Sequence, residues 1–153
     1  MKKVTMILTL VAFTATTFTT FTGCKKEGCI DANADNYNDD AKKDDGTCTY
    51  PTINKTSAGN SGDIKGGGGT ASDTWTFTNN NTTAGWDMSI DATSGSFRLV
   101  LQDASGTTVL DKTLTAGSGA QDADGTSSSG TAGTWTCTIT LTDFNGSGDY
   151  SFI

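Results

Sequence analysis

The chain has 153 residues, a formal net charge of −7 and no histidine. This length accommodates one folded domain with short appendages. An acidic chain has no basic patch with which to displace counterions from phosphates, so we expect no nucleic-acid partner. The lack of histidine also removes the commonest general base and metal ligand.

The N-terminal segment has the order of a secretory signal. A basic start precedes the uncharged residues 4–21, and Gly23 places a small residue directly before Cys24. The sequence around Cys24 resembles the lipobox of bacterial lipoproteins, with Phe21 where that family usually has leucine. The resemblance implies that signal peptidase II cuts before Cys24 and that this cysteine carries the lipid.

We therefore expect residues 1–23 to be a cleaved signal peptide. The mature protein would then be lipid-anchored in the outer membrane and exposed at the cell surface. The alternative is a transmembrane helix that the mature protein retains. The uncharged stretch has only 18 residues, short for crossing a bilayer, and it contains seven threonines, which weaken helix formation. Both features favour the signal.

Export to an oxidising compartment makes the other three cysteines informative. Cys29 and Cys48 flank a compact polar segment, and we expect them to form a disulfide. Cys137 is left over. It lies in the alternating stretch 135–141, on the same face as three large apolar side chains, so we expect a buried thiol. A catalytic cysteine would need a partner base such as histidine.

The cysteine-bounded segment carries a second resemblance. Its relevant positions are Gly28, Cys29, Asp31, Ala34, Asn36, Tyr37, Ala41, Asp44, Asp45, Gly46 and Cys48. This set resembles a short motif of secreted and surface proteins of the Bacteroidetes. The resemblance implies a lineage and a surface location, and it carries no activity with it. A disulfide closing a loop of this size contributes about 3 kcal/mol by restricting the unfolded chain.

Oxygen-bearing side chains in the same segment raise the question of calcium. Some of them match positions 1, 3 and 5 of an EF-hand loop, but Asn36 and Lys42 stand where that loop requires glycine and glutamate. An ordinary EF-hand is therefore excluded. Two interpretations stay open: a different calcium geometry, or side chains that cap turns by bonding to nearby backbone amides. The candidate ligands are Asp31, Asn33, Asp35, Asp44 and Asp45.

Four segments follow from composition. After the signal, residues 24–50 hold the lipid site and the expected disulfide. Residues 51–70 are polar and include four consecutive glycines, which predicts a flexible linker. Residues 71–153 contain short runs in which apolar residues alternate with threonine, separated by turn-forming clusters. This pattern predicts an antiparallel β-sandwich of about 6–8 strands.

The connection from Ala116 to Gly133 interrupts this rhythm with only small and polar residues. It is longer than most hairpin loops, and the sequence leaves open whether it is a mobile loop or an inserted edge. Asp122 and Asp124 within it are candidate binding or metal residues on ligand type alone. The alternative is that they are simply solvated in a flexible loop.

Three tryptophans raise the question of carbohydrate binding, because exposed aromatic faces bind sugar rings. Trp75, Trp86 and Trp135 each share strand parity with other apolar residues, so we expect them in the core. Glycoside hydrolysis needs paired carboxylates of which one has a raised pKa. The aspartates of this domain fall mostly in turns or on the predicted polar faces. We therefore expect no catalytic residues.

These features predict a non-enzymatic surface lipoprotein with a structural, adhesive or assembly role. Its partners would be the membrane, through the lipid, and glycans or other surface subunits. A carbohydrate- or calcium-dependent binding module is the second hypothesis. An accessory domain of a secreted hydrolase is the third. Calcium is the one cofactor that the sequence suggests.

Overall fold

The computed structural model describes residues 25–153, so the predicted signal and Cys24 lie outside it. The described residues form six antiparallel strands in one hydrogen-bonded sheet of order β1-β2-β6-β3-β4, with β5 paired to β3. Within this range there is no helix that is long and apolar enough to cross a bilayer. The strands are β1 (Thr52–Ile53), β2 (Ser61–Asn79), β3 (Gly85–Gln102), β4 (Thr108–Thr115), β5 (Gln121–Thr126) and β6 (Gly133–Phe152).

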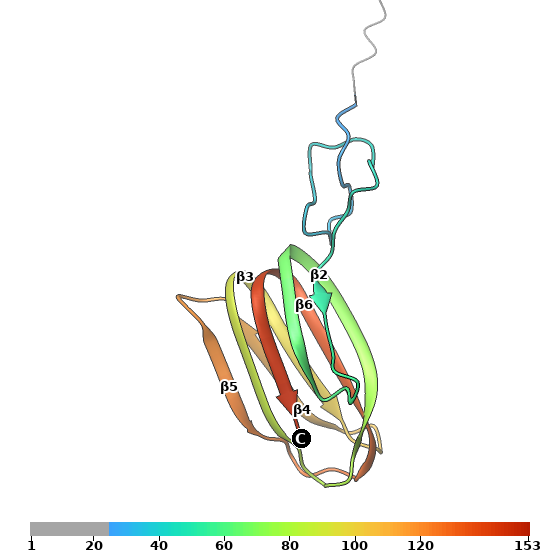
Figure 1. Ribbon diagram of the computed structural model, residues 1–153, viewed down its shortest axis with the longest axis vertical. Helices are drawn as coiled ribbons and strands as arrows, with labels where there is room; N and C mark the ends of the chain where they lie inside the picture. Colours follow the sequence, from blue (N-terminus) through green and yellow to red (C-terminus); the bar gives the residue numbers. More distant parts are fainter. Residues whose placement is uncertain (1–24) are drawn as a thin grey trace, which may run out of the picture.

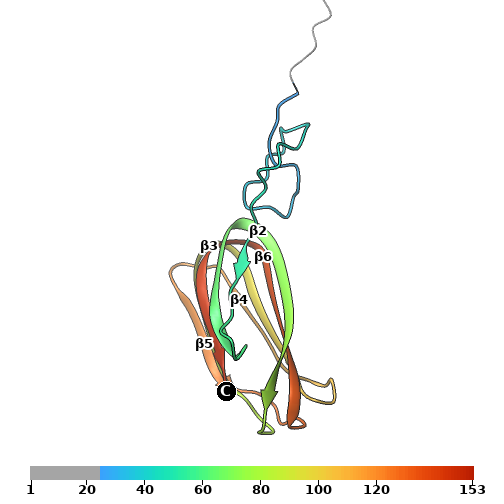
Figure 2. The ribbon, with the colours of Figure 1, turned by 45° about the vertical axis from the view of Figure 1, so that its right-hand side comes forward.

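Three long strands, β2, β3 and β6, run through the whole sheet and bend near the end that carries the N-terminal segment (Figure 1). Register shifts mark the bend, between Gly67 and Ala71 in β2 and between Ala92 and Ser96 in β3. Beyond the bend each strand continues in a second layer, so that the sheet faces itself (Figure 2). The first layer comprises residues 61–67, 85–92 and 145–152 with β1 and β5; the second comprises residues 71–79, 96–102 and 133–142 with β4.

The core lies between these layers. Phe77 of the second layer packs on Phe152 of the first, with ring centroids 4.6 Å apart. Fully burying a large apolar side chain contributes about 1.5–3 kcal/mol. The alternation in β6 that predicted a half-buried strand is confirmed, because four of its side chains are completely buried between threonines that are at least partly exposed: Trp135, Cys137, Ile139 and Leu141. The predicted antiparallel sandwich is thus made from a single folded sheet.

Residues 51–70 do not form the predicted flexible linker, because β1 and the first part of β2 lie within them. Their glycines sit where backbones approach closely. A Cβ atom at Gly66 would lie 2.4 Å from the carbonyl oxygen of Phe144, and one at Gly69 would lie 2.4 Å from that of Asn33. The glycine-rich composition therefore serves tight packing in a bent strand rather than flexibility.

The connection from Ala116 to Gly133 is an inserted edge, one of the two alternatives that the sequence left open. Its central residues form β5, which pairs with the first six residues of β3. Just after β5, the buried Ser127 hydroxyl accepts a hydrogen bond from the amide of Ala84 at 2.9 Å. The segment is therefore part of the first layer.

All three tryptophans were predicted in the core, and one of them is fully buried there. Trp135 is completely buried, as predicted. Trp75 and Trp86 pack against the core but are only partly buried. The Trp75 indole N–H donates to the carbonyl oxygen of Gly59 at 2.6 Å, and the Trp86 ring lies against the backbone of Gly125.

Candidate functional surfaces

The disulfide segment, residues 25–50, stands on the bent end of the sandwich (Figure 1). The predicted Cys29–Cys48 disulfide is present. Its apolar interior is small, since the buried apolar side chains are Cys29, Ala34 and Ala41. The larger apolar side chains point outward: Ile30, Tyr37 and Tyr50 are each 48–49% exposed. The segment therefore depends on the disulfide and on polar contacts rather than on a core.

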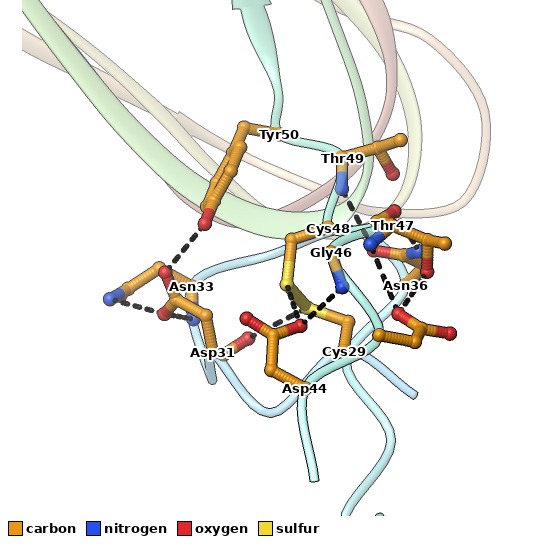
Figure 3. Close-up of a disulfide and its surroundings, with 11 residues drawn as sticks. Cys29, Asp31, Asn33, Asn36, Asp44, Gly46, Thr47, Cys48, Thr49 and Tyr50 are labelled. Carbon is orange, nitrogen blue, oxygen red and sulfur yellow. Dashed lines mark hydrogen bonds between the residues drawn. A yellow bond between two sulfur atoms is a disulfide. The ribbon is translucent and has the colours of Figure 1, made fainter. Parts of the chain in front are cut away.

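Several carboxylates in this segment accept hydrogen bonds from backbone amides within tight turns (Figure 3). Asp31 accepts hydrogen bonds from the Asn33 amide at 2.9 Å and from the Tyr50 hydroxyl at 2.8 Å, and these bonds lower the pKa of Asp31. Asp44 accepts from the amide of Gly46 at 2.9 Å. Asp45 likewise caps its own turn, because the hydroxyl and amide of the residue two positions on both donate to it and lower its pKa.

Asp35 and Asn33 face the sheet instead. One carboxylate oxygen of Asp35 accepts from the amides of Gly67 and Gly69 at 2.7 and 3.0 Å. The carbonyl oxygen of Asn33 accepts from the amide of Thr70 at 2.8 Å. The five candidate calcium ligands are thus engaged in hydrogen bonds within the segment or with the sheet, and across residues 25–153 no three acidic or cysteine side chains are arranged to hold a metal ion.

The outer face of the first layer is strongly acidic, and we call it the acidic face. Four residues form one row across the paired strands of this layer. From one edge inward they are Asp122 of β5, Ser89 of β3, Asp149 of β6 and Asp63 of β2. Asp124 lies on the same face of β5. The exposed carboxylates of this face are Asp63, Asp87, Asp91, Asp122, Asp124 and Asp149. A shallow depression crosses it, lined in part by Asp63, Asp91 and Asp149.

Asp87 shows the electrostatic effect of this arrangement. Partial desolvation raises its pKa, and the negative charges of Asp122, Asp149 and Asp124 raise it further. The sequence singled out Asp122 and Asp124 but missed their neighbours. The alternation of Asp87 and Ser89 with apolar residues is visible in the sequence, but the pairing of β3 with β5 and β6, which brings these carboxylates together, is not.

The outer face of the second layer is rich in threonine and uncharged over β2 and β6, and we call it the threonine face. Four hydroxyl residues of β2 lie directly opposite four of β6. The hydroxyls of Ser72 and Thr140 are 3.1 Å apart, and those of Thr74 and Thr138 are 3.0 Å apart. The paired residues are Ser72, Thr74, Thr76 and Thr78 opposite Thr140, Thr138, Thr136 and Thr134.

A cavity of about 270 Å³ opens at the end of the sandwich opposite the disulfide segment. Phe77 and Phe152 give it apolar walls, and Asn60 and Asn79 give it polar ones. The sequence offered no signal for it, because it forms where the loop before β2 meets the end of the same strand.

Two further polar side chains are structural. The Cys137 thiol is free and completely buried, as predicted, and burial raises its pKa far above the usual range. Asp103 accepts hydrogen bonds from Ser105, Thr107 and Thr131 at 2.7–2.9 Å, and these bonds, led by that from the Ser105 hydroxyl, lower its pKa to about 2. Asp103 therefore joins two loops at the end of the sheet.

No protein-family model matches this chain, and no curated protein matches it either.

Proposed function

We propose that this protein is a non-enzymatic surface lipoprotein, attached to the outer membrane through a lipid on Cys24, with an adhesive or assembly role. The order of basic start, uncharged stretch and small residue before Cys24 supports the anchor. The position of the disulfide segment supports it too, since the chain enters the structure at the far end of that segment from the sandwich (Figure 1).

The observation that carries the adhesive role is the threonine face. Its hydroxyls are arranged in facing pairs over two strands and carry no charge. Such a face offers many weak hydrogen bonds, direct or through bridging water, to a polymer or a neighbouring subunit. Catalysis would need groups whose surroundings separate their pKa values. The carboxylates described above instead accept hydrogen bonds from nearby backbone amides and hydroxyls, or they are spread over an open face.

Acylation is tested by metabolic labelling with a palmitate analogue. We expect label on the wild type and none on Cys24→Ser, which should also leave the membrane fraction. Cys137→Ala is the matched control, because that thiol is buried in the sandwich and should not affect labelling. Full membrane retention of unlabelled Cys24→Ser would contradict the anchor and support a retained transmembrane segment.

The adhesive role is tested by comparing two variants, each with one lysine introduced into β6: one on the threonine face and one on the acidic face. Thr136 and Ser147 both belong to β6 and point to opposite outer faces. Thr136→Lys should reduce binding on a glycan array and cell-to-cell aggregation, whereas Ser147→Lys should not. Ser147 is exposed and Thr136 is partly exposed, so both variants should keep the fold, and each should change stability by no more than about 1 kcal/mol, the span of strand preferences. Equal effects of the two substitutions would contradict the assignment to the threonine face.

The acidic face favours a calcium-dependent binding module as the second candidate. The pKa of Asp87 is raised first by partial desolvation and then by the negative charges of its neighbours, and a divalent cation would relieve that second effect. The carboxylates are spread across four strands, so this candidate implies weak, diffuse accumulation of calcium and no closed coordination site.

A further inference from the structure

The disulfide segment is joined to the sandwich at the bend of β2. Gly67 and Gly69 lie at the register shifts of this strand. Their amides both donate to one carboxylate oxygen of Asp35, and the amide of Thr70, the next residue, donates to the carbonyl oxygen of Asn33. Converging backbone amides of this kind form a concavity that favours an anion. The carboxylate of Asp35 thus sits in a receptor that β2 itself provides.

Shape supports the same contact. A Cβ atom at Gly67 would approach the Asp35 side chain to 3.2 Å, and one at Gly69 would lie 2.4 Å from the carbonyl oxygen of Asn33. Any side chain at Gly69 would therefore push the segment away from the strand. Glycine at these two positions is explained by the docked segment, because it leaves room for the segment's backbone.

The docking residues are hydrogen-bonded to the arm of the segment that carries Cys48. The amide of Asp35 donates to the carbonyl oxygen of Thr49 at 2.7 Å, next to Cys48. Asn36 binds the same arm twice, donating to the carbonyl oxygen of Thr47 and accepting from the amide of Thr49. Since the segment has little apolar interior, the two arms would separate without the covalent link.

We propose that Asp35 and the glycines of β2 form a latch that fixes the disulfide segment on the sandwich in one orientation, and that the Cys29–Cys48 disulfide keeps the latch closed. In the oxidised protein the N-terminal side of the chain leaves the sandwich in a fixed direction. A thiol reductant opens the latch by thiol–disulfide exchange: the Cys29–Cys48 bond becomes two thiols, the reductant becomes its own disulfide, and residues 25–50 become a flexible tether. The latch does not depend on the lipid or on any partner.

Hydrogen exchange of the purified full-length chain tests the latch. Asp35→Ala should speed exchange at Gly67, Gly69 and Thr70 about tenfold, while the rest of β2 and β6 stays protected. Asp39→Ala is the matched control, an exposed aspartate of the same segment that takes no part in the contacts above. Formate should restore protection in Asp35→Ala, because it can occupy the vacated receptor, whereas chloride at equal ionic strength should not.

The disulfide arm of the proposal is tested in the same way. Reduction, or the double substitution Cys29→Ser and Cys48→Ser, should reproduce the exchange pattern of Asp35→Ala and broaden the distance distribution from small-angle scattering. Unchanged exchange at Gly67 and Gly69 in Asp35→Ala would overturn the latch. Uniformly faster exchange over all strands, in Asp35→Ala and in the milder Asp35→Asn, would overturn it too, because the contact would then belong to global stability. Unchanged exchange after reduction would overturn the dependence on the disulfide.

Discussion

Asp103 concentrates more hydrogen bonds than any other carboxylate described above, and none of its partners is a cation. No role was expected for Asp103 from its sequence position, although an aspartate two residues before a serine in a turn often accepts hydrogen bonds from the following amides. Its oxygens join the loop after β3 to the loop before β6. A single side chain thus fixes the relative positions of two connections that lie far apart in the chain.

This bonding makes stability depend on acidity. The pKa of Asp103 is lowered from 3.8 to about 2 in the folded protein, so its contribution is complete above the unfolded value and is lost as the pH falls through the folded value. We expect Asp103→Asn to lower the melting temperature at neutral pH. The difference in melting temperature between this variant and the wild type should become smaller as the pH falls from about 4 to about 2.

Thermal unfolding followed by circular dichroism over that pH range is the measurement. Asp39→Asn serves as the control and should track the wild type throughout. A gap between Asp103→Asn and the wild type that stays constant down to pH 2 would show that the charge of Asp103 is not what binds the loops.

At the scale of elements, the alternation of apolar and polar residues predicted the strands correctly, whereas the glycine-rich stretch was wrongly predicted to be a linker. The buried set of β6 follows directly from alternation, since a side chain every second residue faces the core. Residues 66–69 are all glycines and so carry no alternating pattern of side chains. Composition alone therefore could not distinguish a flexible linker from a bent strand that another segment's backbone packs against. The segment around β5 was ambiguous for a similar reason, because Ala123, flanked by two aspartates, is the one apolar residue of β5 that packs on the core.

β5 leaves an unpaired edge, and its two aspartates suit that position. Charged side chains on an edge strand discourage pairing with another chain. We expect the double substitution Asp122→Thr and Asp124→Thr to leave the fold intact and to cause concentration-dependent self-association, measured by sedimentation velocity. The same double substitution at Asp87 and Asp91, on the interior strand β3, should stay monomeric. Self-association of both variants would assign the effect to lost net charge rather than to the edge.

At the scale of the whole molecule, the two layers present opposite chemistry from one sheet. The acidic face gathers six aspartates, while the threonine face is neutral over β2 and β6. The sequence predicted the acidity and the threonine strands but not their separation, because only the bend assigns each half of a strand to a different side.

Calcium should reveal this asymmetry. We expect calcium to raise the melting temperature slightly, since a weakly bound ligand at a concentration equal to its dissociation constant stabilises by about 0.4 kcal/mol. The double substitution Asp87→Asn and Asp122→Asn should reduce the increase, and Asp111→Asn on the second layer should keep it in full. Calorimetry with calcium, compared with sodium at equal ionic strength, is the measurement. An increase that the first pair of substitutions leaves unchanged would place the ion elsewhere.

The bend also governs how the molecule folds and unfolds. Each long strand belongs to both layers, so neither layer can melt while the other stays intact. Ser61 must pair with Ser151 before the first layer is complete, and Asn79 must pair with Gly133 before the second is complete. Pairings so distant in sequence form slowly, because the intervening chain loses its entropy before the contacts are made. Unfolding should accordingly follow a single cooperative transition, with refolding in the millisecond-to-second range typical of β-sandwiches.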